Sequence, residues 1–332
     1  MDYIIGEYGA NLPALTYNEP MRRALILYNP VAGRFSVKPF LRSVTKVLAE
    51  SGWQTEVTAT RSGAHATESA RQAAAEKFDA IFASGGDGTI GQVAAGLVGT
   101  DTALGILPSG TANVLALEFG LPVFSWTRWW ALKDNARTLA DAPVHPVDVG
   151  FCNGHPFLLW AGMGLDAMTI HAIEPRIRME KFFAFPEYFG TTVWNASQWS
   201  GLRLRLWADN EEVEGNFMLA VVNNIRRYMG GLAVLSPDAT MDDGEFDLWL
   251  LSGNNLADAL LRAYELWRGQ HLSSDKARRI PFRHLRITAK SPFLVQTDGE
   301  PRPETRDALI TIQPRSLRML MPDRALDLLS KI

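Results

Sequence analysis

Three glycines and an aspartate lie together in the segment Gly-Gly-Asp-Gly-Thr at residues 85–89. Glycine lets the backbone turn sharply and come close to a ligand, because no Cβ stands in the way. The segment lies between an apolar run at residues 78–83, which predicts a buried strand, and a helical pattern at residues 90–97. A loop at such a junction points backbone N–H groups outward, which suits a phosphate. Asp87 adds a carboxylate whose partner could be a metal ion, a ribose hydroxyl or a proton.

Three further segments are candidates to converge on the same ligand. Asn-Pro-Val-Ala-Gly-Arg at residues 29–34 follows a predicted strand, although alone it is better explained as a structural turn. Pro-Ser-Gly-Thr-Ala-Asn at residues 108–113 is a second small-residue loop between a strand and a helix. Asp-Gly-Glu at residues 298–300 places two carboxylates around a tight turn, a triplet that is common as a plain turn signal. Neither glycine loop is a Walker P-loop, because no lysine follows, and the dinucleotide fingerprint and the protein kinase signatures are missing.

The elements that must position these loops alternate between strands and helices in the first part of the chain. Strands are predicted at residues 24–28, 54–60, 78–83 and 103–107, and helices at residues 37–51, 64–77, 90–97 and 113–119. This alternation predicts a doubly wound parallel sheet with helices on both faces. Because the glycine-rich loops all follow strands, they gather at the carboxyl edge of the sheet, where open α/β sheets bind ligands.

After about residue 146 the pattern changes to short, mostly alternating strands separated by turn residues. These strands are predicted at residues 147–151, 157–160, 202–207, 217–222, 246–250 and 285–288. They indicate a β-rich second domain, a sandwich or an open barrel, with helical stretches near 166–199 and 254–271. We therefore expect an N-terminal extension (1–21), an α/β domain (22–145) and a β-sandwich domain (146–314). The C-terminal residues from about 315 to 332 are a candidate to pack back on the first domain.

Composition narrows the class of protein. A net charge of −3 gives no electrostatic footprint for nucleic acid, so no nucleic-acid partner is expected. The single cysteine, Cys152, rules out an intramolecular disulfide framework and fits a reducing cytoplasm. No early segment has the pattern of a signal peptide, and no run approaches the roughly 18 apolar residues of a membrane span. A cytoplasmic protein is the resulting expectation.

Together these segments resemble the diacylglycerol kinase catalytic family, which includes bacterial lipid kinases, sphingosine kinases and ceramide kinases. The resemblance depends on the pairing of the glycine–aspartate loop with Leu-Gly-Ile-Leu-Pro-Ser-Gly-Thr-Ala-Asn at residues 104–113. The order also fits, with Asn-Pro-x-x-Gly-Arg first and Asp-Gly-Glu late in the chain. The resemblance covers the chain from about residue 22 onward. It implies an α/β ATP-binding domain resembling that of NAD kinase, a β-sandwich lipid-binding domain and an active site in the cleft between them.

The same resemblance implies roles for individual residues. It makes Glu300 the proton acceptor, with Asp298 beside it, and it places Asp87 at the ATP–Mg²⁺ end as the third catalytic carboxylate. The ion would be held by Asp87 or by one of the other two carboxylates, because hard cations take oxygen ligands. The residues implied to bind ATP lie at the ends of the first-domain strands: Asn29, Pro30, Gly33, Thr60, Gly85, Gly86, Asp87, Gly88, Thr89, Gln92, Gly110 and Thr111.

A second Mg²⁺ site is implied in the β-rich domain. There Asp243 would bind the ion with the backbone carbonyls of Thr240 and Glu245, in a structural or regulatory role. The chain also departs from the family pattern in two segments. Gly91-Gln92 stands where relatives usually carry Asn-Glu, and Met229 replaces the third glycine of a later glycine patch.

The resulting hypothesis is an ATP-dependent lipid kinase that phosphorylates a hydroxyl of diacylglycerol or a related lipid. Two alternatives stay open at this point. One is a kinase for a soluble substrate, similar to NAD kinases, and the other is a non-catalytic sensor that binds a nucleotide or a lipid. The resemblance also makes a homodimer plausible.

A lipid substrate predicts peripheral association with the inner membrane surface. The candidate docking surface combines the tryptophan-rich stretch 126–130 with residues 176–199. Basic residues beside aromatic ones suit an anionic interface, and the alternative is a basic solvent face over core aromatics. The residues that suggest docking in the second stretch are Arg176, Arg178, Lys181, Phe182, Phe183 and Phe185.

Overall fold

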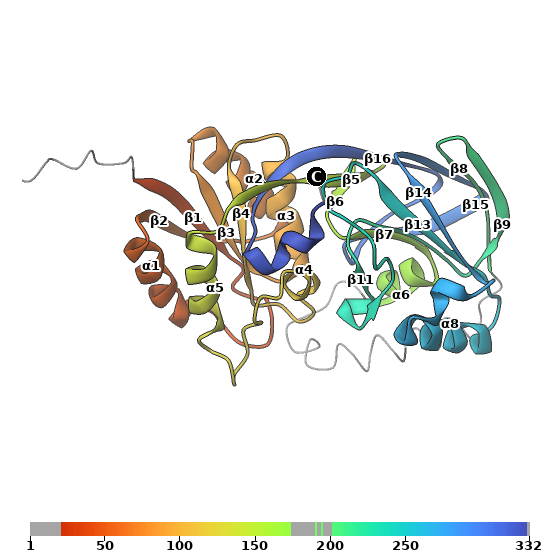
Figure 1. Cartoon of the computed structure of the whole chain (residues 1–332), viewed down its shortest axis with the longest axis horizontal. Coiled ribbons are helices and arrows are strands. Elements are labelled where there is room, and N and C mark those ends of the chain that lie inside the picture. The colour runs from red at the N-terminus through yellow and green to blue at the C-terminus, as the bar shows by residue number, and fades with distance from the viewer. Residues whose placement is uncertain (1–20, 174–189, 191–193, 195–200, 331–332) are drawn as a thin grey trace, which may run out of the picture.

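The computed structural model describes residues 21–173, 190, 194 and 201–330. Figure 1 shows two halves side by side, a helix-covered sheet formed by the first part of the chain and a β-rich half formed by the rest. The extension 1–20 and the predicted docking stretch 176–199, apart from residues 190 and 194, lie outside the described residues.

The first half is a parallel sheet with strand order β4-β3-β1-β2. Strands β3 and β4 are buried along their whole length, as expected for strands covered by helices on both faces. This arrangement confirms the predicted doubly wound fold. Its elements are β1 (Arg22–Tyr28), η1 (Lys38–Phe40), α1 (Leu41–Glu50), β2 (Trp53–Ala59), α2 (Gly63–Ala75), β3 (Ala80–Gly85), α3 (Asp87–Leu97), β4 (Ala103–Pro108), α4 (Val114–Glu118) and α5 (Ala131–Ala140).

The second half is built mainly from antiparallel strands around a separate apolar core, which confirms the predicted β-rich domain. Its central strand order is β14-β13-β10-β7-β15-β16. Its elements are β5 (Val144–Cys152), β6 (His155–Phe157), β7 (Trp160–Gly164), α6 (Leu165–Ile173), β8 (Leu202–Ala208), β9 (Glu211–Phe217), β10 (Leu219–Asn223), β11 (Arg227–Tyr228), η3 (Met229–Gly231), β12 (Ala233–Val234), β13 (Phe246–Leu251), α8 (Leu256–Arg268), η4 (Gln270–Ser273), β14 (Ala277–Phe282), β15 (His284–Thr297), β16 (Glu300–Leu320) and η5 (Asp323–Leu328).

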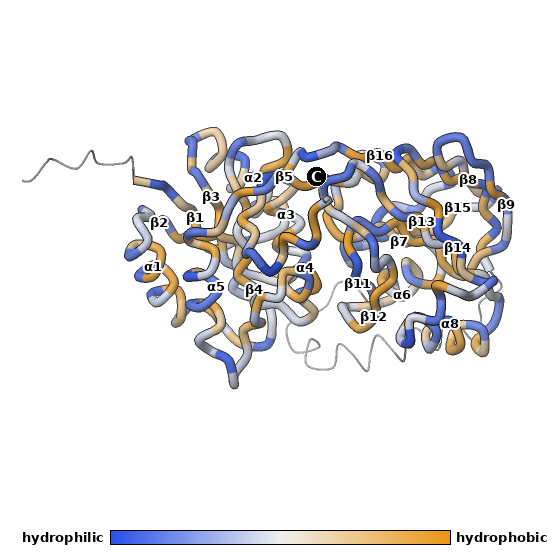
Figure 2. The backbone as a smooth tube through the Cα atoms, in the orientation of Figure 1, coloured by the Kyte–Doolittle hydropathy of each residue, from blue (hydrophilic) through white to orange (hydrophobic). Residues whose placement is uncertain are grey.

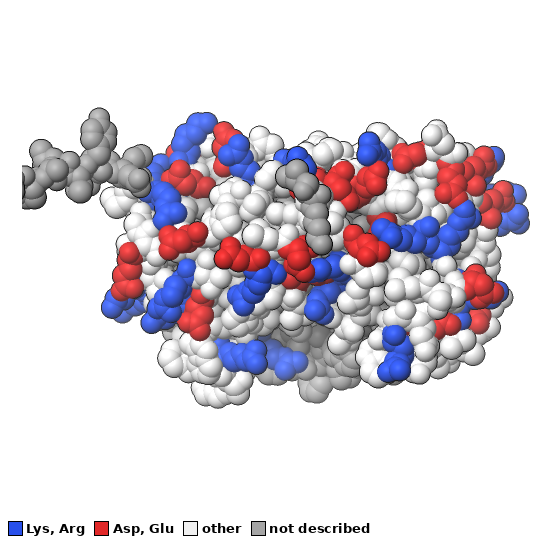
Figure 3. Space-filling view, viewed as in Figure 1, with Lys and Arg blue, Asp and Glu red and all other residues white. Residues whose placement is uncertain are grey.

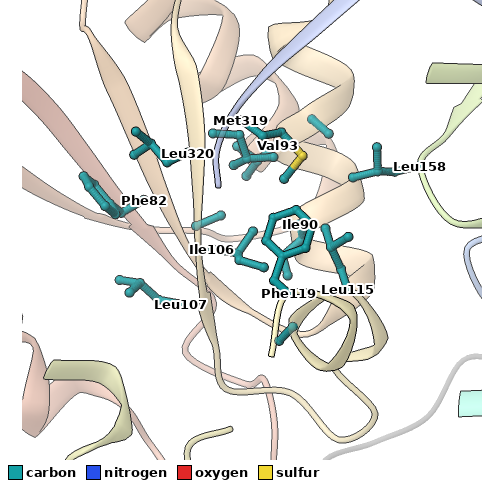
Figure 4. Packing of buried hydrophobic residues seen from close by; sticks show 14 of the residues in the cluster. Phe82, Ile90, Val93, Ile106, Leu107, Leu115, Phe119, Leu158, Met319 and Leu320 are labelled. Atoms are coloured by element: carbon teal, nitrogen blue, oxygen red, sulfur yellow. The ribbon is translucent and has the colours of Figure 1, made fainter. Parts of the chain in front are cut away.

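One strand joins the two halves. β16 is 21 residues long, pairs antiparallel with β15 and β5, and then runs parallel to β4, with Met319 opposite Leu104. Figure 4 shows Met319 and Leu320 packed among the core side chains of the first half. The result is one continuous 14-stranded sheet. The sequence pattern suggested that the C-terminal residues pack back on the first domain, but it did not predict a strand shared by both halves.

The predicted strand at residues 157–160 was wrong in its centre. Leu158 and Leu159 form the break between β6 and β7, because their backbone N–H groups donate to the carboxylate of Asp298 rather than to a neighbouring strand. The long helix predicted near 166–199 begins as α6, which is described only to Ile173.

Candidate active site

The loops after β1 and β3 are joined by the side chain of Asn29. Its Nδ2 donates to Thr89 Oγ1 at 3.0 Å, and its Oδ1 accepts from the backbone N–H of Val31 at 3.0 Å. An Asn side chain that bonds its own backbone two residues on is a common way to fix a turn. Asn29 therefore holds its own turn and the start of α3 in one arrangement.

The loops after β3 and β4 touch through glycine backbone. A Cβ on Gly110 would lie 2.2 Å from Gly86 Cα, so only glycine fits there. Asn113 holds the second loop, since its Oδ1 accepts from Gly110 N–H at 2.7 Å while its own backbone is left-handed (φ +53°). The sequence reasoning did not assign a role to Asn113. The residue type itself could have indicated this role, because asparagine tolerates the left-handed conformation better than most residues.

These loops and the start of β16 line a cleft of about 610 Å³. It lies at the carboxyl edge of the parallel sheet, where the sequence placed the ligand. The structure brings together ten of the predicted ATP-binding residues and one carboxylate in its lining: Asn29, Pro30, Gly33, Thr60, Gly86, Gly88, Thr89, Gln92, Gly110, Thr111 and Glu300.

Two predicted residues lie beneath this lining. Gly85 ends β3 and is buried. A Cβ at this position would lie 2.4 Å from Thr89 Cβ, so a side chain would not fit. Asp87 begins α3, and its carboxylate turns toward α4, where Leu115 N–H donates to Oδ1 at 3.2 Å. Burial raises the pKa of Asp87 above its ordinary value, although the backbone hydrogen bonds lower it. Asp87 thus ties the glycine loop to α4.

Asp298 is held by backbone groups of the second half. Its two carboxylate oxygens accept from the N–H groups of Leu158 (2.7 Å), Leu159 (2.8 Å) and Trp160 (3.1 Å). The pKa of Asp298 is raised to about 6, because burial and the charge of Asp87 raise it by more than these hydrogen bonds lower it. Asp87 and Asp298 therefore interact electrostatically across the boundary between the halves.

Glu300 follows a two-residue hairpin turn. Asp298 and Gly299 both have positive φ (+50° and +80°), as the Asp-Gly turns of tight hairpins require. This turn places Glu300 over the glycine loop. The closeness is shown by Gly88, where an added Cβ would lie 3.0 Å from Glu300 Oε1. Glu300 also lines a second cavity of about 320 Å³, together with Gly88, Asp298 and Gln92. The carboxylate of Glu300 therefore lies between the two cavities.

Gln92 is anchored by α2. The single hydroxyl proton of Thr67 has two acceptors on Gln92, the side-chain Oε1 (3.1 Å) and the backbone carbonyl (2.8 Å). The neutral amide of Gln92 thus lines both cavities.

The predicted second Mg²⁺ site is an acidic turn after β12. Asp243 Oδ2 accepts from Thr240 Oγ1 at 2.5 Å, and Oδ1 accepts from Glu245 N–H at 3.0 Å. The buried Asp148, which the sequence reasoning missed, accepts from Gly244 N–H at 2.7 Å. Burial raises the pKa of Asp148, and the charge of Asp243 raises it further. The sequence feature that could have indicated Asp148 is a carboxylate in the middle of an otherwise apolar predicted strand.

Met229 occupies a strained position. Its backbone φ is +53°, in the left-handed region, and the two glycines after it also have positive φ. A glycine would adopt this conformation without strain. Met229 also lies at the wall of a small apolar pocket under α8.

Comparison with known proteins identifies the family. The model of the diacylglycerol kinase catalytic domain matches residues 23–152, and that of the YegS C-terminal NAD kinase beta sandwich-like domain matches residues 161–321. A diacylglycerol kinase of Bacillus subtilis (strain 168) is 30% identical over 282 residues, which is 84% of this chain and 90% of the relative. The chain belongs to the diacylglycerol kinase family. This confirms the resemblance that the loops suggested.

Other members of the diacylglycerol kinase family are similar over the same span. A diacylglycerol kinase of Staphylococcus haemolyticus is 28% identical, covering 83% of this chain and 82% of the relative. A crystal structure titled as that of a putative diacylglycerol kinase from Bacillus anthracis has a TM-score of 0.73 at 23% identity, covering 92% of this chain and 98% of that one. This likeness confirms the fold, with its α/β half and its β-sandwich half.

Proposed function

We propose that this protein transfers the γ-phosphate of ATP to a hydroxyl group of diacylglycerol or a related lipid. Membership of the diacylglycerol kinase family supports an ATP-dependent lipid kinase. The observation that carries the proposal is the position of Glu300. A carboxylate from the second half stands over the glycine loop of the first half, in a cleft lined by most of the predicted ATP-binding residues.

The two halves supply complementary chemistry for phosphoryl transfer. This reaction depends mainly on positioning and on stabilising charge. Backbone N–H groups of the glycine loops would hold the phosphates of ATP, which supports the ATP-binding roles proposed for Gly86, Gly88 and Gly110. Glu300 would accept the proton of the lipid hydroxyl, and a base within hydrogen-bond reach contributes roughly 10²- to 10⁴-fold to a rate.

Mg²⁺ fits this site only together with the nucleotide. Among the described residues no three His, Cys, Asp or Glu side chains are grouped to hold a metal ion. That suits Mg²⁺ in kinases, which is bound by one or two carboxylates plus substrate phosphates. With Glu300 as the base, Asp87 or Asp298 would hold the ion, which when bound neutralises phosphate charge. We also propose the second ion at Asp243, with the carbonyls of Thr240 and Glu245.

Location and assembly complete the proposal. A lipid substrate resides in a bilayer, which supports a cytoplasmic enzyme at the inner membrane surface. None of the helices in the described ranges is long and apolar enough to cross a membrane. The family resemblance supports a homodimer, which sedimentation velocity would test.

The decisive experiment compares Glu300→Gln with a matched variant. Glu304→Gln removes an exposed carboxylate from the same strand, four residues farther along β16. Labelled ATP and short-chain diacylglycerol are supplied, and kcat and ATP affinity are measured separately. We expect Glu300→Gln to lower kcat by roughly 100-fold or more while ATP affinity changes less than about twofold. Glu304→Gln should behave like the unchanged protein.

Three results would contradict the proposal. If Glu300→Gln keeps its kcat, Glu300 is not the base. If the unchanged protein phosphorylates NAD but no lipid, the enzyme acts on a soluble substrate, and ATP binding without any turnover would identify a sensor.

A further inference from the structure

Helix α8 exposes an apolar face to solvent. Its side chains Leu260, Leu261, Tyr264 and Trp267 are 48%, 48%, 50% and 66% exposed, whereas Arg262 is buried. The four exposed residues follow helical spacing, so they form one apolar face. A helix of a water-soluble domain normally turns such a face toward its core. We therefore expect the exposed apolar face of α8 to bind a partner.

A second apolar cluster lies in the first half, in the segment before α5. Trp126, Trp129 and Trp130 are 75%, 54% and 45% exposed. Their rings touch other aromatic rings, with centroids 5.9 Å apart for Phe35 and Trp126 and 5.8 Å for Trp129 and Trp130. These contacts give the cluster a fixed shape. The stretch 126–130 that the sequence singled out is thus an exposed aromatic surface.

Both clusters lie on one border of the molecule. In Figure 1 the segment before α5 projects from the lower border of the first half, and α8 lies along the lower border of the second half. Figure 2 shows apolar residues alternating with polar ones along α8. Two segments with exposed apolar side chains, one from each half, therefore lie along the same border of the molecule.

The charges beside the clusters are positive. Arg128 lies between the tryptophans and Arg268 follows Trp267, and both are exposed. The segment at residues 121–131 contains no Asp or Glu, and neither do the exposed positions of α8 from Leu260 to Arg268. Figure 3 shows basic side chains on the lower border of both halves. The surface is therefore complementary to a negative partner.

We propose that this border, formed by Trp126, Trp129, Trp130 and the α8 face, is the site at which the protein binds the surface of an anionic lipid bilayer. The inference deepens the proposed function, on which it rests for the location of the substrate. Tryptophan and arginine suit the headgroup level, and leucines beside them reach the acyl boundary. A bilayer is the partner that contacts two separated clusters at once, because it is flat and extended.

Vesicle flotation tests the surface without depending on catalysis. The variants are Leu260→Gln, Trp126→Gln and both together. Leu309→Gln is the control, because Leu309 is 50% exposed, like Leu260, but lies on β16, which runs along the opposite border in Figure 1. Vesicles contain either phosphatidylcholine alone or phosphatidylcholine with phosphatidylglycerol. Turnover of a short-chain, water-soluble diacylglycerol is measured in parallel.

We expect the unchanged protein to bind vesicles with phosphatidylglycerol at least about fivefold more tightly than neutral vesicles. Each single substitution should weaken binding about fivefold and the double variant about 20-fold, because apolar area is withdrawn from the interface. Leu309→Gln should bind normally, and turnover of the soluble lipid should stay unchanged in all variants.

Normal vesicle binding by the double variant would overturn the proposal. So would a dimer in sedimentation velocity that Leu260→Gln dissociates while vesicles are not bound, because the α8 face would then bind a second copy. If no variant, including the unchanged protein, phosphorylates the soluble lipid, the kinase function fails, and flotation still decides the surface.

Discussion

The two halves of the molecule build the cleft from different parts of the chain. In the first half the loops meet through backbone, since Gly86 and Gly110 approach so closely that a side chain would not fit. In the second half the contribution to the cleft is the carboxylate of Glu300, which follows the hairpin turn that contains Asp298. One half can therefore hold a ligand through N–H groups, and the other can move a proton.

This difference predicts different sensitivities to mutation. A contact between two glycine backbones is disrupted when a side chain is added to either glycine, because no existing side chain can move aside to make room. A carboxylate loses its function when its charge is removed, because the charge strengthens the hydrogen bonds from the N–H groups that hold it in position. The following variants separate the two kinds of damage.

The largest effect is expected for Gly110→Ala. The new Cβ would overlap Gly86 Cα, so the loops after β3 and β4 must separate. We expect ATP affinity to fall on the order of 100-fold, the equivalent of about 3 kcal/mol of overpacking. Isothermal calorimetry measures the affinity, and circular dichroism checks that the variant is folded. ATP affinity within threefold of normal would show that backbone contact does not shape the cleft.

A smaller effect is expected for Asp298→Asn. The folded-state pKa of about 6 lies above the ordinary value of 3.8, so the folded protein holds this proton more tightly than the unfolded chain does. Asp298 therefore contributes stability below about pH 4 that is lost as the pH rises toward 6, a decrease on the order of 2 kcal/mol. The variant should lack this decrease.

Urea unfolding from pH 4 to pH 7, without ATP or Mg²⁺, measures the difference in unfolding free energy between the two proteins. The prediction is wrong if that difference is the same at every pH. Asp87 faces Asp298 electrostatically, so Asp87→Asn should also reduce the pH dependence, because it removes a charge that raises the pKa of Asp298.

The smallest effect is expected at a contact between the halves. Glu118 of α4 is 2% exposed, accepts from Arg227 N–H at 2.5 Å and lies 3.5 Å from Arg226 Nε. We expect Glu118→Gln to lower the free energy of unfolding by about 1 kcal/mol, because a buried charged acceptor is lost.

Asp327→Asn is the matched control for that contact. Asp327 pairs with the same Arg226 at 3.0 Å but is 63% exposed, and exposed pairs contribute less than about 1 kcal/mol. Thermal unfolding of both variants gives the comparison. Equal destabilisation by the two substitutions would show that burial of Glu118 is not what strengthens the contact.

Sequence alone predicted the first half well because its signals are local. Each strand is an apolar run, each helix follows within a few residues, and the loops after β1, β3 and β4 lie at one edge by the rule for parallel sheets. The pairing of Asn29 with Thr89 and the meeting of Gly86 with Gly110 follow from that shared edge.

The second half was harder to predict because its key contacts are far apart in sequence. Asp298 binds N–H groups at residues 158–160, about 140 positions earlier, and nothing near either segment signals the pairing. The course of β16 depends on partners in both halves. The exposure of one apolar face of α8 cannot be predicted from periodicity, because an apolar face has the same pattern whether it points inward or outward.

The long path of β16 has a consequence for how the protein is made. During synthesis the four parallel strands of the first half leave the ribosome well before β16, which pairs with β4 and places Met319 in their core. Until then that half lacks a strand and leaves an edge of its sheet unpaired, and such edges are prone to bind other chains. Removal of residues 315–330 should therefore expose the first half to proteases and aggregation, although these residues lie outside the cleft.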